Sequence, residues 1–261
     1  MLLSCSAHLR GRQNAGLAPL AALAGALGLL ALALAGSPAL AGVEATGVLM
    51  APEPLLASHP TQADFKAEPA SRDARNVADW AMASGDAGGA PFIIIDKINA
   101  KVFVFDDQGQ LLGAAPALLG LAKGDDTVPG IGRRKLATMS AAERTTPAGR
   151  FVAVIGHDFE QDVLWVDYEN GVALHRVKVF NPKDHRFARL ASASLPDKRI
   201  SYGCINVPVK FYDQVVAPAF TGTSGIVYIL PDTKPIGAVF AIHAAAANAQ
   251  GQVLIQAAPG G

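Results

Sequence analysis

The sequence predicts a mainly β domain with a few short helices. Short runs of β-branched and aromatic residues recur between Phe92 and Phe180, and clusters of Gly, Asn and Asp separate them. Turn dipeptides such as Asn170-Gly171 stand between pairs of these runs, which is the pattern of antiparallel hairpins. We count at least six such strands, few helical segments and no internal repeat.

The N-terminal residues 1–41 are expected to be a signal peptide or an N-terminal anchor. Arg10 and Arg12 precede an Ala/Leu-rich run, and Ala39-Leu40-Ala41 resembles a signal-peptidase site. The apolar run is longer than a usual signal core, so an uncleaved membrane anchor stays open as the alternative. In both cases we expect an exported protein that faces the periplasm or the cell wall, with membrane contact only through this segment.

Residues 42–72 are rich in Ala, Pro and small polar residues without periodicity, which predicts a linker. The expected domain covers residues 73–232 and begins with a short helix over residues 73–83, with Val77 and Trp80 on its apolar side. The Ala/Gly-rich C-terminal tail, residues 233–261, contains two strand-like runs at 238–242 and 253–256.

Most of the expected domain consists of strands joined by turns. A hairpin, a third strand, a long polar loop and three further strands are expected in that order. Their ranges are 92–95 with 101–105, 110–121, 122–146, 151–155, 163–167 and 172–180.

A second short helix is expected over Val209–Val216, with Asn206 as its N-cap and Pro208 in its first turn. This helix would begin just after Cys204. The partial positive charge of a helix N-terminus lowers the pKa of a nearby thiol, so the expected helix would help to activate Cys204.

The chain carries 22 basic and 22 acidic residues, so its net charge is zero with neutral histidines. That balance gives no support to nucleic-acid binding or to a polybasic membrane surface. The histidines have no metal-ligand spacing with one another or with a cysteine, so we expect no metal site.

Cys204 is the most informative residue, because cleavage of a signal peptide would remove Cys5 and leave Cys204 as the only cysteine. A lone thiol in an exported protein is explained by intermolecular pairing, by inert burial or by nucleophilic reactivity. A thiol nucleophile needs a nearby base. In a strand, His175 shares the apolar face of Ala173 and Val177, which suits either a core histidine or that base.

These residues together resemble the L,D-transpeptidase (YkuD-type) family of bacterial cell-wall enzymes. The family pattern is a histidine followed downstream by Ser/Thr-His-Gly-Cys-hydrophobic-Arg/Asn. His175 matches its first position, and Ser201, Gly203, Cys204, Ile205 and Asn206 match the second block, where Tyr202 replaces the usual histidine. The turn Thr146-Pro147-Ala148-Gly149 resembles the family's Thr-Pro-x-Gly segment, and the match extends from about Pro91 to Asp232.

The resemblance implies an L,D-transpeptidase-like β-sandwich that acts on peptidoglycan stem peptides without a cofactor or metal. It implies Cys204 as the nucleophile and His175 as the general base, with the backbone carbonyl of Arg176 orienting the imidazole. The substrate-binding or oxyanion residues would be Ser201, Tyr202, Gly203, Asn206 and Arg176, with backbone N–H groups at Gly203 and Cys204 as the oxyanion donors.

Two departures from the family pattern leave questions open. Tyr202 removes a histidine that helps to shape the pocket. The interval between His175 and Cys204 is longer than usual, and its extra residues, 181–199, are rich in basic side chains that suit either a solvated loop or a carboxylate-binding lid. Two functions remain as alternatives to transpeptidation: an L,D-carboxypeptidase with the same residues, and a non-catalytic wall-binding module.

Overall fold

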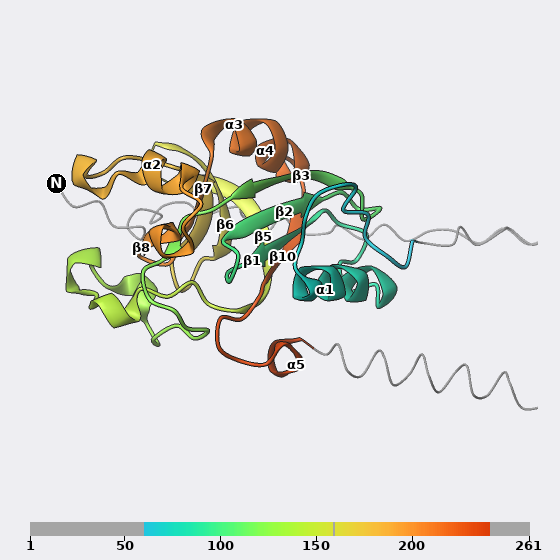
Figure 1. The fold of residues 1–261 in the computed structure, drawn as a ribbon, viewed down its shortest axis with the longest axis horizontal. Helices are drawn as coiled ribbons and strands as arrows, with labels where there is room; N and C mark the ends of the chain where they lie inside the picture. The colour runs from blue at the N-terminus through green and yellow to red at the C-terminus, as the bar shows by residue number, and fades with distance from the viewer. Residues whose placement is uncertain (1–59, 159, 241–261) are drawn as a thin grey trace, which may run out of the picture. The chain divides into compact units, whose positions relative to one another are not determined.

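The computed structural model describes residues 60–158 and 160–240, and these form a mainly β fold, as the sequence predicts (Figure 1). The strands are β1 (Phe92–Asp96), β2 (Lys101–Phe105), β3 (Leu111–Pro116), β4 (Leu119–Gly120), β5 (Gly149–Asp158), β6 (Gln161–Asp167), β7 (Val172–Arg176), β8 (Arg199–Ser201), β9 (Ile205–Val207) and β10 (Ser224–Ile229). Eight of them make one mixed sheet in the order β3-β2-β1-β10-β5-β6-β7-β9, and β4 pairs with β8 in a small second sheet.

The two predicted hairpins are confirmed. β1 pairs antiparallel with β2, from Phe92 opposite Phe105 to Asp96 opposite Lys101. β6 pairs antiparallel with β7 across the turn that contains Gly171. The φ of Gly171 is 69°, in the left-handed region that favours glycine because glycine has no β-carbon. This second hairpin carries a predicted site residue, because β7 contains His175.

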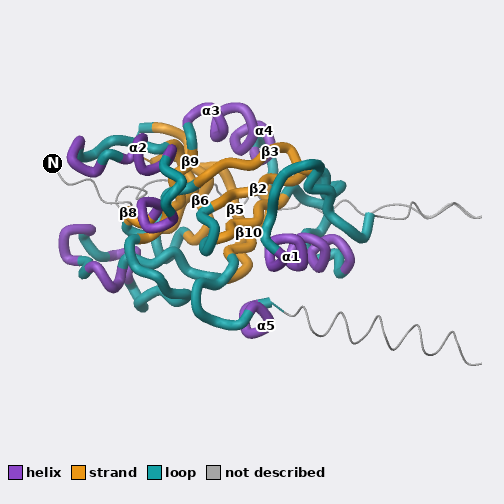
Figure 2. The backbone as a smooth tube through the Cα atoms, in the orientation of Figure 1, coloured by secondary structure: helices purple, strands orange, loops and turns teal. Residues whose placement is uncertain are grey.

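One hydrophobic cluster fills the inner side of the large sheet. It joins inward-facing residues of strands from both ends of the sheet, including Val102 and Val104 of β2 and Ile205 and Val207 of β9. The helical segment α3 (Val209–Phe211), the π-helix Tyr212–Val216 and α4 (Ala217–Phe220) cover this cluster. The two halves of the sheet therefore pack against each other, and Figure 2 shows α3 and α4 together on one side of the strands.

The outer face of β1, β2 and β10 is covered by helix α1 (Arg72–Ala83), which lies on the opposite side from α3 and α4 in Figure 1. Ser71 caps this helix by accepting a hydrogen bond from the N–H of Ala74. Ala74, Val77, Ala78 and Ala81 are its buried residues, and the small alanines allow close approach to the sheet.

The edge strand β9 contacts the segment that follows β3, the strand at the opposite edge of the sheet. Leu118, between β3 and β4, exchanges both backbone hydrogen bonds with Asn206, at 2.8 and 2.9 Å. The expected single strand over 110–121 is therefore wrong: Pro116 has no N–H to continue the ladder, so the chain turns there and Leu118 reaches β9.

Two other expectations near the thiol are also wrong. Asn206 is not a helix N-cap but lies within β9, because the flanking β-branched Ile205 and Val207 bury their side chains in the core. The helix begins at Val209 with Pro208 at the cap position. The strand expected over 172–180 ends at Arg176, because its partner β9 ends before Pro208.

Both ends of the described chain pack against the hydrophobic cluster under helix α1. Within the expected linker, Phe65 is buried against Phe103 and Phe105, with ring centroids 5.2 and 4.9 Å away. Within the expected tail, a short helix, α5 (Ile236–Val239), replaces the start of the strand expected over 238–242. Residues 1–41 and the strand expected at 253–256 lie outside the described residues.

The long segment 122–146 has no strand or α-helix but contains three single-turn 3₁₀ helices, which agrees with its polar, broken sequence. The segment 181–199 is folded into 3₁₀ turns around helix α2 (Arg186–Ala191). None of the helices in the described part of the chain is long and apolar enough to cross a membrane.

Candidate active site

Cys204 lies in the tight turn between β8 and β9, and the side chain of Ser201 holds that turn closed. The Ser201 hydroxyl donates to the carbonyl oxygen of Cys204 at 2.6 Å and accepts from the N–H of Gly203 at 3.1 Å. Ser201 is buried, and its hydroxyl is engaged in holding the turn closed. In this conformation the Gly203 N–H, an expected oxyanion donor, is engaged by Ser201.

Gly203 is required in this turn by its conformation and by its surroundings. Its φ is 133°, a region that side-chain-bearing residues rarely adopt, and a β-carbon there would lie 2.8 Å from the carbonyl oxygen of Thr145. The segment around Thr145 therefore fits directly against the thiol turn.

The sheet places Cys204 and His175 on the same face of neighbouring strands. In the parallel pairing of β7 and β9, His175 is the register partner of Asn206. Cys204 precedes Asn206 by two residues, and alternation puts both side chains on one face. Cys204 packs in a small cluster with Ala173, Trp165 and Val163, and Ala173 shares the face of His175. The two predicted catalytic residues are thus brought together.

Both residues are buried, with 5% of Cys204 and 3% of His175 exposed to solvent. The Cys204 thiol approaches the carbonyl oxygen of Gly171, at 3.6 Å, in the turn between β6 and β7. A thiol in apolar surroundings stays protonated unless a base takes its proton. Because Cys204 is followed by a strand, the helix N-terminus expected to activate it is not there, and His175 is the candidate base that remains.

The imidazole of His175 is oriented at both ring nitrogens. Nδ1 lies 2.7 Å from the carbonyl oxygen of Arg176, and Nε2 lies 3.4 Å from the side-chain nitrogen of Asn206. A carbonyl oxygen only accepts hydrogen bonds, so Nδ1 carries the proton and Nε2 is the basic nitrogen. The Arg176 side chain itself points elsewhere, to Asp162 and Asp213.

Two residues beside the thiol turn were not among the predicted site residues. The buried Thr146 hydroxyl donates to the carbonyl oxygen of Gly203 at 2.8 Å and accepts from the N–H of Gly120 at 2.9 Å. The Thr-Pro-x-Gly signal marks this residue, but its role depends on contacts far away in sequence.

The other is Arg144, whose guanidinium lies over the Tyr202 ring, 4.1 Å from the ring centroid. Tyr202 is half-buried in the turn that contains Cys204, so this pair places a cation beside that turn. Arg144 has no sequence signal, because it lies in a polar loop among other charged residues.

The basic residues of the segment 181–199 do not form a uniformly solvated loop. Lys183 and His185 are exposed, but Arg186 and Lys198 are buried. Lys198 donates to the carbonyl oxygens of Arg189 and Leu190, and Arg186 donates to the side-chain oxygen of Asn206 at 2.9 Å. Arg186 therefore contacts the candidate site through Asn206.

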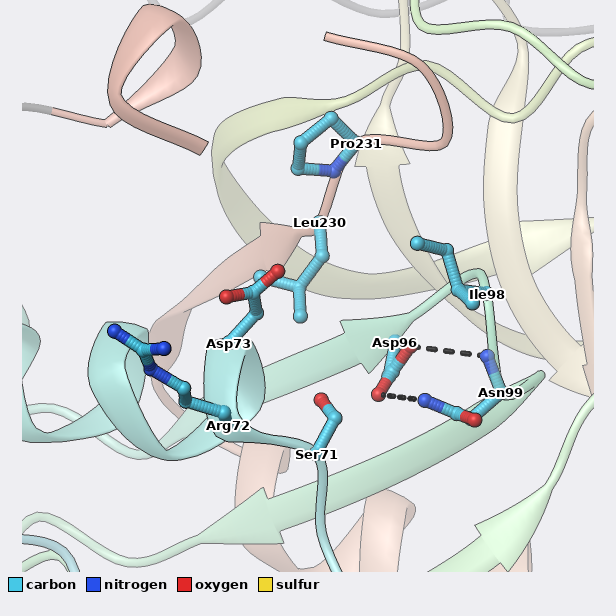
Figure 3. Close-up of a pocket in the computed structure, with 8 residues that line it drawn as sticks. All are labelled: Ser71, Arg72, Asp73, Asp96, Ile98, Asn99, Leu230 and Pro231. Atoms are coloured by element: carbon cyan, nitrogen blue, oxygen red, sulfur yellow. Dashed lines mark hydrogen bonds between the residues drawn. The ribbon is translucent and has the colours of Figure 1, made fainter. Parts of the chain in front are cut away.

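A hollow of about 240 Å³ lies elsewhere, between the start of α1 and the ends of β1 and β10. Figure 3 shows its polar residues, among which Asp96 accepts hydrogen bonds from the backbone and side chain of Asn99, at 3.0 and 2.8 Å. The lining includes no residue of the thiol site. It holds no cysteine or histidine, so Cys204 remains the candidate active site.

Comparison with known proteins finds solved structures that are similar to this chain at low sequence identity. No protein-family model matches the chain, and no curated protein matches it. Several solved structures are similar, among them the following two. The L,D-transpeptidase from Xylanimonas cellulosilytica is 14% identical over 54% of this chain and 60% of its own, with a TM-score of 0.31.

The second is the helical cell shape determining protein Pgp2 from Campylobacter jejuni, a mutant, which is 14% identical over 68% of this chain and 62% of its own, with a TM-score of 0.38. In each case this chain spans less than two thirds of the structure that it matches.

Proposed function

We propose that this chain is a peptidoglycan L,D-transpeptidase that acts through a thioester on Cys204. The observation that carries the proposal is the placement of a buried thiol and an oriented imidazole on one face of neighbouring strands, with Asn206 in contact with both residues. The resemblance of Ser201-Tyr202-Gly203-Cys204-Ile205-Asn206 to the family pattern supplies the substrate class: stem tetrapeptides that end in D-alanine.

The first half of the reaction forms the thioester. Nε2 of His175 takes the thiol proton, and the Cys204 thiolate attacks the carbonyl carbon that links the third residue of the stem to D-alanine. The new C–S bond forms as the C–N bond breaks, and the imidazolium returns its proton to the leaving amine of D-alanine.

The second half resolves the thioester. An amine of a second stem peptide loses a proton to Nε2 and attacks the thioester carbonyl, so a new amide C–N bond forms. The C–S bond breaks, and the departing thiolate recovers its proton from His175. A buried site favours the amine over water as the acceptor, because closure around the substrate excludes solvent.

Arg144 supports an acidic substrate. Its guanidinium lies over Tyr202 and donates to the carbonyl oxygen of Met139 through Nε and Nη2, and no ion pair with an acidic side chain is found for it among the residues the structure describes. Arginine recognises carboxylates through paired hydrogen bonds, and each stem peptide carries carboxylates. We therefore assign Arg144 and Tyr202 to stem-peptide binding in place of the family histidine.

The test is to incubate the full chain with muropeptides that carry tetrapeptide stems. We expect free D-alanine and dimers joined between two third-position residues, and no turnover by Cys204→Ala, whose fold should persist because the thiol makes few polar contacts. Tripeptide stems without dimers would identify the carboxypeptidase instead.

A carbapenem offers a second readout, because its strained carbonyl should acylate the thiol and add its mass to Cys204. A folded protein that releases no D-alanine and forms no adduct would be the wall-binding module, and the proposal would be wrong.

A further inference from the structure

The side-chain amide of Asn206 is the point where both proposed catalytic residues meet a residue from the segment 181–199. Its nitrogen lies 3.3 Å from the carbonyl oxygen of Cys204 and 3.4 Å from Nε2 of His175. Its oxygen accepts from the guanidinium of Arg186 at 2.9 Å. Asn206 is 1% exposed, so these contacts are made without competition from bulk water.

The chemistry of Arg186 decides which way this amide points. A guanidinium only donates hydrogen bonds, so the atom that faces Arg186 must be the amide oxygen. The amide nitrogen, which only donates, then faces the Cys204 carbonyl and His175. An amide flipped by half a turn would point its N–H groups at the guanidinium and its oxygen at Nε2.

The orientation of the amide also agrees with the tautomer of His175. The Arg176 carbonyl requires the proton on Nδ1, and the Asn206 N–H groups require a lone pair on Nε2. A flipped amide would instead favour a proton on Nε2, the nitrogen that must accept the thiol proton. Two independent contacts thus hold the imidazole in the form that acts as a base.

Arg186 is itself held in place. Its side chain is 6% exposed, its Nε donates to Asp184 at 3.1 Å, and it stands at the first position of α2. The ring of Phe180 lies 5.8 Å from the guanidinium. The additional residues between His175 and Cys204 therefore place a buried cation, Arg186, against Asn206 in the candidate site.

We propose that Arg186 is a positioning residue that acts through Asn206, fixing the amide so that His175 and the Cys204 turn keep their reactive arrangement. This inference rests on the proposed function, since it assumes that His175 is the base. It assigns the segment 181–199 a role in the reaction that requires no contact with substrate.

A double-mutant cycle on the alkylation of Cys204 by iodoacetamide tests the proposal. Asn206→Ala and Arg186→Met should each slow alkylation about tenfold, as expected for loss of one charge-assisted hydrogen bond. If Arg186 acts through Asn206, the double variant should be no slower than Asn206→Ala alone. A loss in the double variant equal to the product of the two single losses would overturn the proposal.

The matched control is Arg189→Met on the same helix, where the guanidinium binds the carbonyl oxygens of Asp184 and Asp197 and not Asn206. We expect this change to leave alkylation unchanged. A loss as large as that of Arg186→Met would show that any damage to α2 slows the thiol. If Arg186→Met does not fold, Arg186→Lys, which keeps the charge and one donor, serves in the cycle.

The ¹⁵N spectrum of the His175 ring, assigned with His175→Gln, gives a readout that does not depend on turnover. The native chain should show a protonated Nδ1 and an unprotonated Nε2. Asn206→Asp, which presents an acceptor to Nε2, should add a proton there. An Nε2 that stays unprotonated in this variant would overturn the role of the amide. These spectra report the arrangement even if the muropeptide test fails.

Discussion

Thr146 shows how much of the candidate site depends on one buried hydroxyl. It links the Gly203 carbonyl, in the thiol turn, to the Gly120 N–H of β4, and its own carbonyl accepts from the Lys97 ammonium at 2.8 Å. Through this residue the thiol turn is connected to β1, β4 and the loop before β5.

Replacing Thr146 by valine keeps the shape but leaves the Gly120 N–H and the Gly203 carbonyl without the hydroxyl. We expect a loss of about 1–3 kcal/mol in the free energy of unfolding, since buried polar groups lose a partner. Urea denaturation measures this. Thr138→Val, at an exposed threonine with a local bond to Lys135, should change stability by less than about 0.5 kcal/mol. Equal losses would contradict this account of Thr146.

The sequence indicates candidate site residues that lie in a recognisable local pattern. It does not indicate residues whose role depends on contacts with residues far away in the sequence. A lone cysteine after glycine and a histidine in an alternating strand are visible in the sequence itself. Arg144, Arg186 and Thr146 act on residues that lie between 20 and 58 positions away, and no local pattern reports such contacts. Cys204, His175 and Asn206 are brought together by the register of β7 and β9, which composition does not reveal.

Among the elements, strands marked by strong turn signals are predictable and the segment around the thiol is not. The hairpins β1–β2 and β6–β7 are local pairings, so their turns suffice to define them. Asn206 followed by Pro208 has the pattern of a helix start. The tertiary pairing with His175 and Leu118 overrides it, because Ile205 and Val207 gain more by burial in the sheet.

A change in helix α1 tests whether the stability of this helix affects the reactivity of Cys204. Ser71→Ala removes the side-chain cap that accepts from Ala74, and should lower the free energy of unfolding by about 1 kcal/mol. Because α1 packs on the outer face of β1, β2 and β10, the alkylation rate of Cys204 should not change. Thermal unfolding with alkylation kinetics checks both, and a slower thiol would mean that α1 and the site are coupled.

At the scale of the whole molecule, one buried polar junction joins distant parts of the chain. Lys97, after β1, contacts Asp125 at 2.9 Å, and Asp125 also accepts from the backbone N–H groups of Asp232, Thr233 and Lys234. Arg199, at the start of β8, pairs with Asp232 at 2.6 Å. The junction therefore ties the loop after β4 to the segment after β10, and it explains why residues 233 and 234 belong to the fold.

Acid should weaken this junction. Burial acts to raise the pKa of Asp125, but the hydrogen bonds from Thr233 and Lys97 outweigh it and hold the pKa below its usual value of 3.8. The folded state then binds fewer protons than the unfolded state near that pH. The stabilisation is complete well above the unfolded pKa and is lost as pH falls toward the folded one.

Between pH 6 and pH 3 the Asp125 carboxylate should account for about 1 kcal/mol of the decrease in the free energy of unfolding. Urea denaturation at both pH values measures the decrease. In Asp125→Asn, which is less stable at pH 6, the decrease should be smaller by that amount. An unchanged difference between the two pH values would show that another carboxylate carries the acid sensitivity.

The position of β10 also sets the order in which the chain can fold. β10 lies in the middle of the large sheet, between β1 and β5, yet a ribosome makes it after the other nine strands of the described residues. Its pairing of Phe92 with Ile226 spans more than 100 residues, and such non-local contacts form slowly. Until Ile229 emerges, β1 and β5 each expose an unpaired, apolar edge that invites aggregation. A chain that stops before Ser224 would keep the cysteine and histidine but lack the strand that joins the two halves.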